Sequence, residues 1–266
     1  ATSRGASSAG MEPRARSRSP SKVPPLPKRD GDGASWTRNL LFRPPSGFWG
    51  DQAWYDLHLH RRLPEAEHML RELVYALPPC SGKRVADYGA GTGRVALAVA
   101  AAYPAAELTL LDQDATRGAV ALGRLRQQKA EAPEDVAGRG ATREFLRCDL
   151  TAEDRPLPGG PAEGSRGDEG YDVVIAAQSV RHVASPPAHY AVAGATKDAI
   201  NFVAEAPMEV RYARIFAGLH ASLVPGGHVF VADHVEHGHP GVFAHMNLLV
   251  GAGFVDVDVA WRFRDW

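Results

Sequence analysis

A run of acidic and histidine side chains near the C-terminal end of the sequence carries the residue types from which metal and catalytic sites are built. Residues 232–241 read ADHVEHGHPG, in which the chemically active side chains are Asp233, His234, Glu236, His237 and His239. Histidine and carboxylate at spacings of one to three residues are typical of zinc and iron sites. A histidine near neutral pKa also suits general acid–base catalysis. The Gly-His-Pro-Gly run that closes the segment is a strong turn signal. It favours an ordinary surface turn over a metal site.

A second group of such residues lies in the segment ADYGAGTGR. Asp87 precedes three glycines at alternate positions, Gly89, Gly91 and Gly93. Glycines allow a tight turn and let a ligand lie against bare backbone. The spacing is not the G-x-G-x-x-G of dehydrogenases, because Arg94 stands where the last glycine would be. Asp112 follows about twenty residues later, the distance at which an acid meets the hydroxyls of a ribose. With Asp149 further along, these residues predict a nucleoside site.

The elements that must position these residues can be read from the hydrophobic pattern. We expect strands over six apolar runs, at 84–88, 107–112, 143–149, 171–177, 227–233 and 254–261. Helical periodicity is present at 92–102, 115–129, 209–223 and 241–251, and before the first strand up to the Pro-Pro pair at 78–79. This alternation predicts an α/β fold, a doubly wound and mostly parallel sheet with helices on both faces. Ligands bind at the carboxyl ends of such strands, where the three acids and Asp233 are expected to meet.

Composition limits the classes of partner. A formal net charge of −1 and a pI near 6.9 provide no basic field for nucleic acid, so we expect no nucleic-acid partner. No apolar run reaches the roughly twenty residues of a membrane span. The two cysteines form no CxxC pair, which favours a reducing compartment and a cytoplasmic location by default. We expect a monomer or a homodimer.

The 266 residues divide into three predicted regions. Residues 1–35 are rich in Ser, Arg and Pro and are expected to be a disordered tail or an organelle transit peptide. Residues 36–80 are expected to form an N-terminal helical cap. Residues 81–266 form the ligand-binding domain, with an insertion at about 184–208 that we interpret as substrate-shaping.

Six segments together resemble the class I S-adenosylmethionine-dependent methyltransferases in their order and spacing. They are DYGAGTG, LTLLDQD, RCDLTAEDRPLP, YDVVIAAQSVRHV, LVPGGHVFVAD and GAGFVDVDV. The resemblance implies a Rossmann-like fold, S-adenosyl-L-methionine as cofactor and S-adenosyl-L-homocysteine as product. The implied contacts are Asp87, Gly89, Ala90, Gly91 and Gly93 for the methionine part, Asp112 for the ribose, Gln113, Asp149 and Leu150 for the adenine, and Ala177 and Gln178 below the sulfonium. A seventh, antiparallel strand is usual in the family, but the sequence ends at RFRDW, so we expect that strand to be missing or truncated.

Several subclasses of the family are disfavoured by residues that this sequence lacks. The segment after the fourth strand reads AAQSVRHV and has no Asn/Asp-Pro-Pro-aromatic motif of base-amino enzymes and no Pro-Cys of cytosine C5 enzymes. It also lacks the acids that hold magnesium in catechol-type enzymes and the two glutamates that clamp a guanidinium. SVRHV is instead similar to the GIRNV stretch of ubiquinone and menaquinone C-methyltransferases.

The predicted function is therefore methyl transfer to the oxygen, nitrogen or carbon of a small-molecule acceptor. His182 and His234 are the candidate bases; the alternative for His182 is that it caps the rim or packs on the cofactor. Candidates for acceptor contacts are Arg181, His189, Tyr190 and Tyr55. The alternatives are an RNA or protein methyltransferase, and a regulatory protein that binds the cofactor without catalysis. Because methyl transfer requires no metal, we expect none at residues 233–239.

Overall fold

The structure of the protein is a computed structural model that describes residues 65–131, 141–150, 156–160, 169–184, 206–233 and 238–262. All of them belong to one compact unit that spans Arg43–Trp266. The expected tail at 1–35 lies outside the described residues. So do most of the expected cap and nearly all of the insertion at 184–208.

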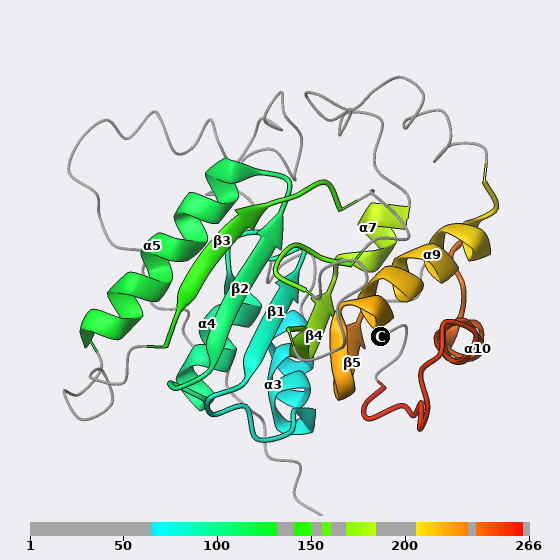
Figure 1. Cartoon of the computed structure of the whole chain (residues 1–266), viewed down its shortest axis with the longest axis horizontal. Helices are drawn as coiled ribbons and strands as arrows, with labels where there is room; N and C mark the ends of the chain where they lie inside the picture. Colours follow the sequence, from blue (N-terminus) through cyan, green and yellow to red (C-terminus); the bar gives the residue numbers. More distant parts are fainter. Residues whose placement is uncertain are drawn as a thin grey trace, which may run out of the picture. The chain divides into compact units, whose positions relative to one another are not determined.

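Helices and strands alternate along the chain as the hydrophobic pattern predicts (Figure 1). Their order is α3 (Ala66–Ala76), β1 (Arg84–Tyr88), α4 (Arg94–Ala102), β2 (Glu107–Asp112), α5 (Ala115–Glu131), β3 (Arg143–Arg147), β4 (Tyr171–Ala177), α7 (Val180–Ala184), α9 (Met208–Ala221), β5 (Leu223–Ala232) and α10 (Val242–Gly251). None of the helices in the described ranges is both long enough and apolar enough to cross a bilayer.

The five strands form one parallel sheet in the order β3-β2-β1-β4-β5. Val85 of β1 pairs with Leu108 of β2 on one side and with Val173 of β4 on the other. The chain first builds outward from β1 to β3 and then returns to place β4 on the opposite side of β1. The strand order therefore reverses between β1 and β4, and in such sheets the ligand crevice lies at the carboxyl ends of these two strands.

Helices cover both faces of the sheet (Figure 1). Helices α3, α4 and α5 pack on one face, where Val85, Leu110 and Ile175 are buried. Helices α7 and α9 pack on the other face, against the neighbouring positions Ala86 and Val174. Strands buried on both sides read as nearly continuous apolar runs, which explains why β4 has the sequence YDVVIAA. The predicted doubly wound fold is confirmed.

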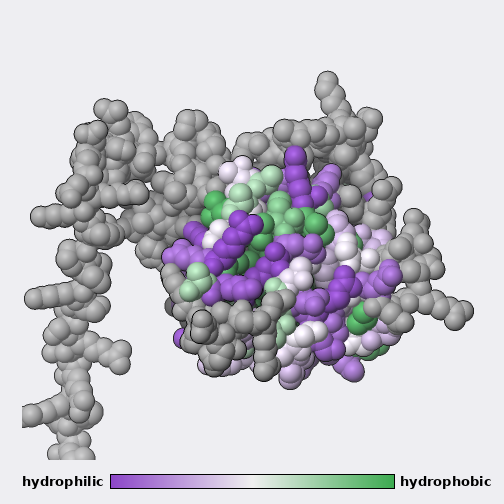
Figure 2. Space-filling model, turned by 60° about the vertical axis from the view of Figure 1, so that its left-hand side comes forward, coloured by the Kyte–Doolittle hydropathy of each residue, from purple (hydrophilic) through white to green (hydrophobic). Residues whose placement is uncertain are grey.

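The outer surface mixes polar and apolar side chains. Figure 2 shows one face of the molecule, on which hydrophilic side chains surround an area of hydrophobic ones. Helix α10 has no fully buried residue, and Phe243 and Val250 on it are largely exposed.

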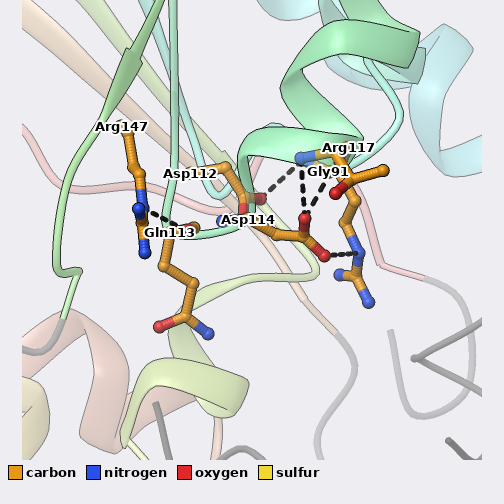
Figure 3. A network of polar contacts seen from close by, with 7 residues as sticks. Gly91, Asp112, Gln113, Asp114, Arg117 and Arg147 are labelled. Atoms are coloured by element: carbon orange, nitrogen blue, oxygen red, sulfur yellow. Dashed lines mark hydrogen bonds and ion pairs between the residues drawn. The ribbon is translucent and has the colours of Figure 1, made fainter. Parts of the chain in front are cut away.

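Asp114 caps the N-terminus of helix α5. Its carboxylate oxygen Oδ1 accepts hydrogen bonds from the N–H groups of Thr116 (2.9 Å) and Arg117 (3.3 Å). These N–H groups belong to the first turn, where the helix itself offers no acceptor. The cap places the start of α5 directly after the end of β2, so Asp112 and Gln113 lie at the edge of the sheet (Figure 3).

Three predicted strands differ from the observed ones. Strand β3 ends at Arg147 rather than at 149, and β5 begins at Leu223, earlier than the predicted 227. A shift in the β4–β5 register between Tyr171 and Val173 lets β5 start before its Pro-Gly-Gly turn.

The predicted strand at 254–261 does not form, so that prediction is wrong. Asp256 adopts a positive φ of 53°, which interrupts extended backbone, and the Val259 N–H bonds locally to the Asp258 carboxylate. The alternating apolar residues there lack a buried face, since Val255 is 83% exposed.

Candidate functional site

The glycine turn after β1 is held against the end of β2 by hydrogen bonds. The N–H of Gly91 donates to Asp112 Oδ2 at 2.8 Å, and the N–H of Asp114 donates to Asp112 Oδ1 at 2.9 Å. The N–H groups of Gly89 and Ala90 both donate to the Leu111 carbonyl, at 2.9 and 3.0 Å. Figure 3 shows the Asp112 carboxylate with Gly91 and Asp114. Two motifs that are separate in the sequence thus form one rigid structure.

Two buried carboxylates lie at the carboxyl ends of β1 and β2. Asp87 is 4% exposed and Asp112 is 6% exposed. Burial raises the pKa of Asp87 to about 7, and the negative charge of Asp112 adds to this effect, while the N–H of Ala96 opposes it by bonding to Asp87 Oδ2 at 3.2 Å. Burial also raises the pKa of Asp112, against the stabilising N–H groups of Asp114 and Gly91. A cationic ligand beside them would offset this cost, because an adjacent positive charge favours the ionised form.

Gly89 is required where the glycine turn approaches the turn after β4. Its φ is +74°, and a Cβ built at this position would lie 2.4 Å from the Cβ of Ser179. Gly93 has a similar restriction, since its Cβ would lie 2.7 Å from that of Ala121 in α5. These contacts bring the β1 turn next to the residues that follow β4, at the point where the strand order reverses.

The end of β3 contributes a second side of the site. The Cys148 N–H donates to the Asp112 carbonyl at 3.1 Å, and Tyr88 Oη donates to the Leu150 carbonyl at 2.9 Å. Leu150 is therefore buried beside β1, whereas Asp149 is exposed. Gln113 lies on the same edge, and its carbonyl accepts a hydrogen bond from Arg147 Nε at 3.1 Å (Figure 3).

The turn after β4 is strained and well held. Gln178 has a φ of +56°, which is uncommon for a residue with a side chain. Its N–H donates to the Ala232 carbonyl of β5 at 2.7 Å, and its side-chain Nε2 contacts Met69 Sδ of α3 at 4.0 Å. Ala177 is the last residue of β4, directly before this turn. Strain of this kind concentrates at functional sites and persists because the surroundings over-determine it.

The predicted acceptor-side residues have different surroundings. Arg181 is buried and pairs with Asp233, with Arg181 Nε 3.1 Å from Asp233 Oδ1. His182 is partly buried in α7, and its Nε2 atom is buried. His234, His189, Tyr190 and Tyr55 lie outside the described residues. The catalytic or acceptor-binding roles predicted for Arg181, His182, His234, His189, Tyr190 and Tyr55 stay predictions.

No group of three or more metal-ligating side chains occurs within the described parts of the chain. In the 233–239 segment, Asp233 contacts Arg181, and His239 Nδ1 lies 3.0 Å from Tyr212 Oη of α9. These two members of the cluster thus bind different partners. His234, Glu236 and His237 lie outside the described residues, so the expectation that no metal binds there stays a prediction.

Sequence reasoning missed Met69 and Ser179 at this edge, and it placed Asp233 there without pairing it with Arg181. Their importance lies in long-range contacts. The only local signal was the position of Ser179 and Arg181 directly after a predicted strand end, where ligand-site residues gather.

The arrangement fits a cofactor that carries both a ribose and positive charge. Asp112 places a carboxylate at the end of β2, and three glycines at positive φ leave bare backbone beside it. The buried Asp87, with its raised pKa, would gain from a positive group nearby. The predicted cofactor, S-adenosylmethionine, contains these features.

Comparison with known proteins agrees with this arrangement. Residues 66–144 match the family model of the methyltransferase small domain. The release factor glutamine methyltransferase of Bordetella pertussis is 27% identical over 199 residues, which are 73% of this chain and 62% of the relative. The same enzyme of Burkholderia pseudomallei is 28% identical over 200 residues, or 73% of this chain and 61% of the relative. The chain thus spans about three fifths of the length of these curated relatives.

A solved methyltransferase from Thiobacillus denitrificans, in complex with S-adenosyl-L-homocysteine, is 20% identical, with a TM-score of 0.37 over 62% of this chain and 47% of that chain. The match over 66–144 covers β1, the glycine turn and β2, which carry Asp87 and Asp112, together with helices α3, α4 and α5. Residues 66–144 of this chain are therefore similar to the methyltransferase small domain, and they lie in an open parallel sheet of the Rossmann-like type.

Proposed function

We propose that the protein binds S-adenosylmethionine at the carboxyl edge of β1, β2 and β3 and transfers its methyl group to an acceptor beside the turn after β4. The observation that carries this proposal is the 2.8 Å hydrogen bond between the Gly91 N–H and Asp112 Oδ2. It joins the glycine turn and the ribose-binding acid into one preformed site. Preformed sites of this kind are typical for cofactors, since little ordering is left to oppose binding.

Each part of the cofactor has a counterpart at this edge. Asp87 and the glycine turn would hold the methionine part, and Asp112 would hold the ribose hydroxyls. The adenine would lie between the residues at the ends of β2 and β3, which are Gln113, Asp149 and Leu150. Ala177 and Gln178 would lie below the sulfonium. The buried carboxylates support this orientation, because the positive groups of the cofactor would stabilise their ionised forms.

When bound, the cofactor would supply a methyl group to a nucleophile that attacks in line with the carbon–sulfur bond, and the sulfur would leave as the neutral thioether of S-adenosylhomocysteine. The residues of this chain then have two tasks, to align the acceptor with that methyl group and to remove a proton where the acceptor carries one. His182 is the proposed base, because it follows the turn after β4 by a few residues and its unperturbed pKa is near neutral. His234 is the second candidate for this role.

The proposed acceptor is a small molecule with a hydroxyl, amine or activated carbon. The net charge of −1 supplies no basic field for RNA. The segment after β4 reads QSVRHV and lacks the Asn/Asp-Pro-Pro-aromatic motif of base-amino enzymes in the family that the sequence resembles. A histidine base next to this turn suits a hydroxyl or amine, whose proton must leave during transfer.

A second candidate acceptor is the side-chain amide of a glutamine in a protein. The two curated relatives are named for this substrate, and their similarity extends over 73% of this chain. The aligned part makes up 62% and 61% of the two relatives, so their remaining residues have no counterpart in this alignment.

Calorimetric titration of the purified protein with S-adenosylmethionine tests cofactor binding. We expect saturable binding that Asp112→Ala weakens and that Asp172→Asn, at the opposite end of the sheet, leaves unchanged. No binding at millimolar cofactor would contradict the proposal.

Incubation with a labelled methyl donor identifies the acceptor class. The panel contains quinols, phenols, amines, thiols, RNA and a glutamine-containing release-factor peptide. Label in a small molecule supports the first acceptor, and label in the peptide alone supports the second. His182→Asn should lower the turnover number by roughly 100-fold or more if His182 removes the proton.

A further inference from the structure

The buried ion pair between Arg181 and Asp233 links the residues after β4 to the residue after β5. The Arg181 N–H donates to Asp233 Oδ2 at 3.2 Å, and Arg181 Nε lies 3.1 Å from Asp233 Oδ1. The two side chains are 8% and 6% exposed. One carboxylate therefore holds both the main chain and the side chain of the same residue.

Residues 178–181, called the β4 turn below, have further attachments. The Gln178 N–H donates to the Ala232 carbonyl at 2.7 Å, so one end of the turn is joined to β5 and the other, through Arg181, to Asp233 directly after it. Between these points, Ser179 packs so closely on Gly89 that a Cβ there would lie 2.4 Å away. The β4 turn is thus fixed between the end of β5 and the glycine turn.

Stability alone is a poor reason for this ion pair. Burying two charges removes them from water, and the attraction between them often does no more than offset that loss. Apolar side chains of similar size would fill the same space without it. What the ion pair adds is a single orientation, because the two carboxylate oxygens contact different groups of Arg181.

We propose that Asp233 is a positioning residue for methyl transfer. Through Arg181 it sets the position of the β4 turn, and with it the surface on which the acceptor meets the methyl group. This inference rests on the proposed function, and it assigns Arg181 to the positioning of the turn. Displacement of a reacting group by about 1 Å can reduce a rate by roughly 100-fold, so a small shift of the turn would be sufficient.

The other end of the sheet offers a matched control. Asp172 at the start of β4 has the same pattern of contacts, since its Oδ2 accepts the Arg84 N–H at 2.9 Å and its Oδ1 contacts Lys83 Nζ at 2.8 Å. Both carboxylates join neighbouring parts of the sheet through one N–H and one cationic side chain. Only Asp233 lies at the carboxyl edge. Asp172 therefore reports what the loss of such a contact does far from the site.

The experiment compares Asp233→Asn and Asp172→Asn with the wild-type protein. We expect Asp233→Asn to lower the turnover number by roughly ten- to 100-fold on the acceptor found with the labelled panel. Its Kd for S-adenosylmethionine should stay within about three-fold of the wild-type value, because all the proposed cofactor contacts except Ala177 and Gln178 lie at the ends of β1, β2 and β3. Asp172→Asn should leave both values unchanged.

Hydrogen–deuterium exchange reads the same effect without an acceptor. In the presence of S-adenosylmethionine, the peptide that contains residues 178–184 should exchange at least about ten-fold faster in Asp233→Asn than in the wild type. The same peptide should be unchanged in Asp172→Asn. Equal exchange in all three proteins would overturn the inference.

A double variant separates positioning from stability. Arg181→Met with Asp233→Leu replaces the ion pair by apolar side chains, which is often neutral or stabilising. We expect its Tm to return to near the wild-type value while its turnover stays low. Recovery of turnover together with Tm would show a purely structural role.

The outcomes also separate this inference from the proposed function. If the wild-type protein binds no S-adenosylmethionine, the proposed function fails. If the wild-type protein binds the cofactor and turns over but Asp233→Asn does so equally well, only this inference fails.

Discussion

The Gly91 amide and the Asp112 carboxylate, which lie 21 residues apart in the sequence, are joined by a hydrogen bond of 2.8 Å. Gly91 belongs to the turn after β1, and Asp112 is the last residue of β2. The bond makes the position of the turn depend on the end of the neighbouring strand. The proposed binding of the cofactor at this edge depends on that connection.

Asp112→Asn should weaken S-adenosylmethionine binding by roughly ten- to 100-fold, because it removes charge-assisted hydrogen bonds to the ribose and to Gly91. Asp112→Ala should weaken it further, since the Gly91 and Asp114 N–H groups then lose their acceptor. Isothermal titration measures both values. For the alanine variant, a Kd within two-fold of the wild-type value would contradict the assigned role. A two-fold change in Kd corresponds to roughly 0.4 kcal/mol of binding free energy.

Gly89→Ala should destabilise the protein more than Gly82→Ala. Both glycines have a similar positive φ, +74° and +72°, so the conformational strain of alanine is about 1 kcal/mol at each. The Cβ at position 89 would also lie 2.4 Å from the Cβ of Ser179, whereas nothing lies within 4 Å at position 82. We expect an additional loss of about 1–3 kcal/mol for Gly89→Ala. Urea unfolding of the two variants measures the difference, and equal losses would contradict the close approach of the two turns.

Asp87 should make the free protein less stable as the pH rises. Its pKa is raised from 3.8 to about 7 in the folded protein, so folding favours the protonated form. The stabilising effect is complete below about pH 4 and is lost as the pH rises through about 7, by up to roughly 4 kcal/mol. Asp87→Asn cannot ionise and should gain stability relative to the wild type over this range. Unfolding free energies of both proteins at about pH 5 and about pH 8 test this, and a difference that does not change with pH would refute it.

The same group should make cofactor binding depend on pH in the opposite direction. Positive groups of S-adenosylmethionine favour the ionised Asp87, which is the minor form below a pKa of about 7. We expect the Kd to be about ten-fold higher near pH 6 than near pH 8, which means weaker binding at the lower pH. In Asp87→Asn the affinity should be low and nearly independent of pH. Titrations in one buffer series provide both curves.

Both cysteines should be unreactive in the folded protein. Burial, with the nearby charges of Asp112 and Asp149, raises the pKa of Cys148 to about 12, and burial also raises the pKa of Cys80. The thiolate is the reactive form, so alkylation by iodoacetamide near pH 8 should be slower than in urea by roughly 100-fold or more. Mass spectrometry of timed samples follows the two sites. Rapid labelling of Cys148 in the native protein would show that the end of β3 opens readily.

Much of the fold was predictable because buried parallel strands have a strong local pattern. The apolar runs at 84–88, 107–112 and 171–177 coincide with β1, β2 and β4. The segment 254–261 has an equally clear alternation, yet it forms no strand. Alternation reports only the ability to pair, and pairing also requires a neighbour and backbone that stays extended, which Asp256 interrupts.

The cofactor side of the site was also predictable in part. The carboxyl ends of parallel strands share one edge, so acids that end successive strands come together in any such sheet. The sequence pattern therefore predicted that Asp87 and Asp112 lie at the carboxyl edge of the sheet. It did not predict the raised pKa of Asp87, because that depends on what covers the side chain.

The sequence by itself determined the strand–helix alternation, the glycine turn and the acids at the strand ends, since each depends on residues within a few positions of one another. The tertiary structure decided which of these residues touch. It placed β4 beside β1, pressed Ser179 against Gly89, and gave Arg181 a buried carboxylate partner in Asp233. These contacts join residues that are distant in the chain, and local preferences of the backbone carry no information about them. The packing of the whole sheet decides them.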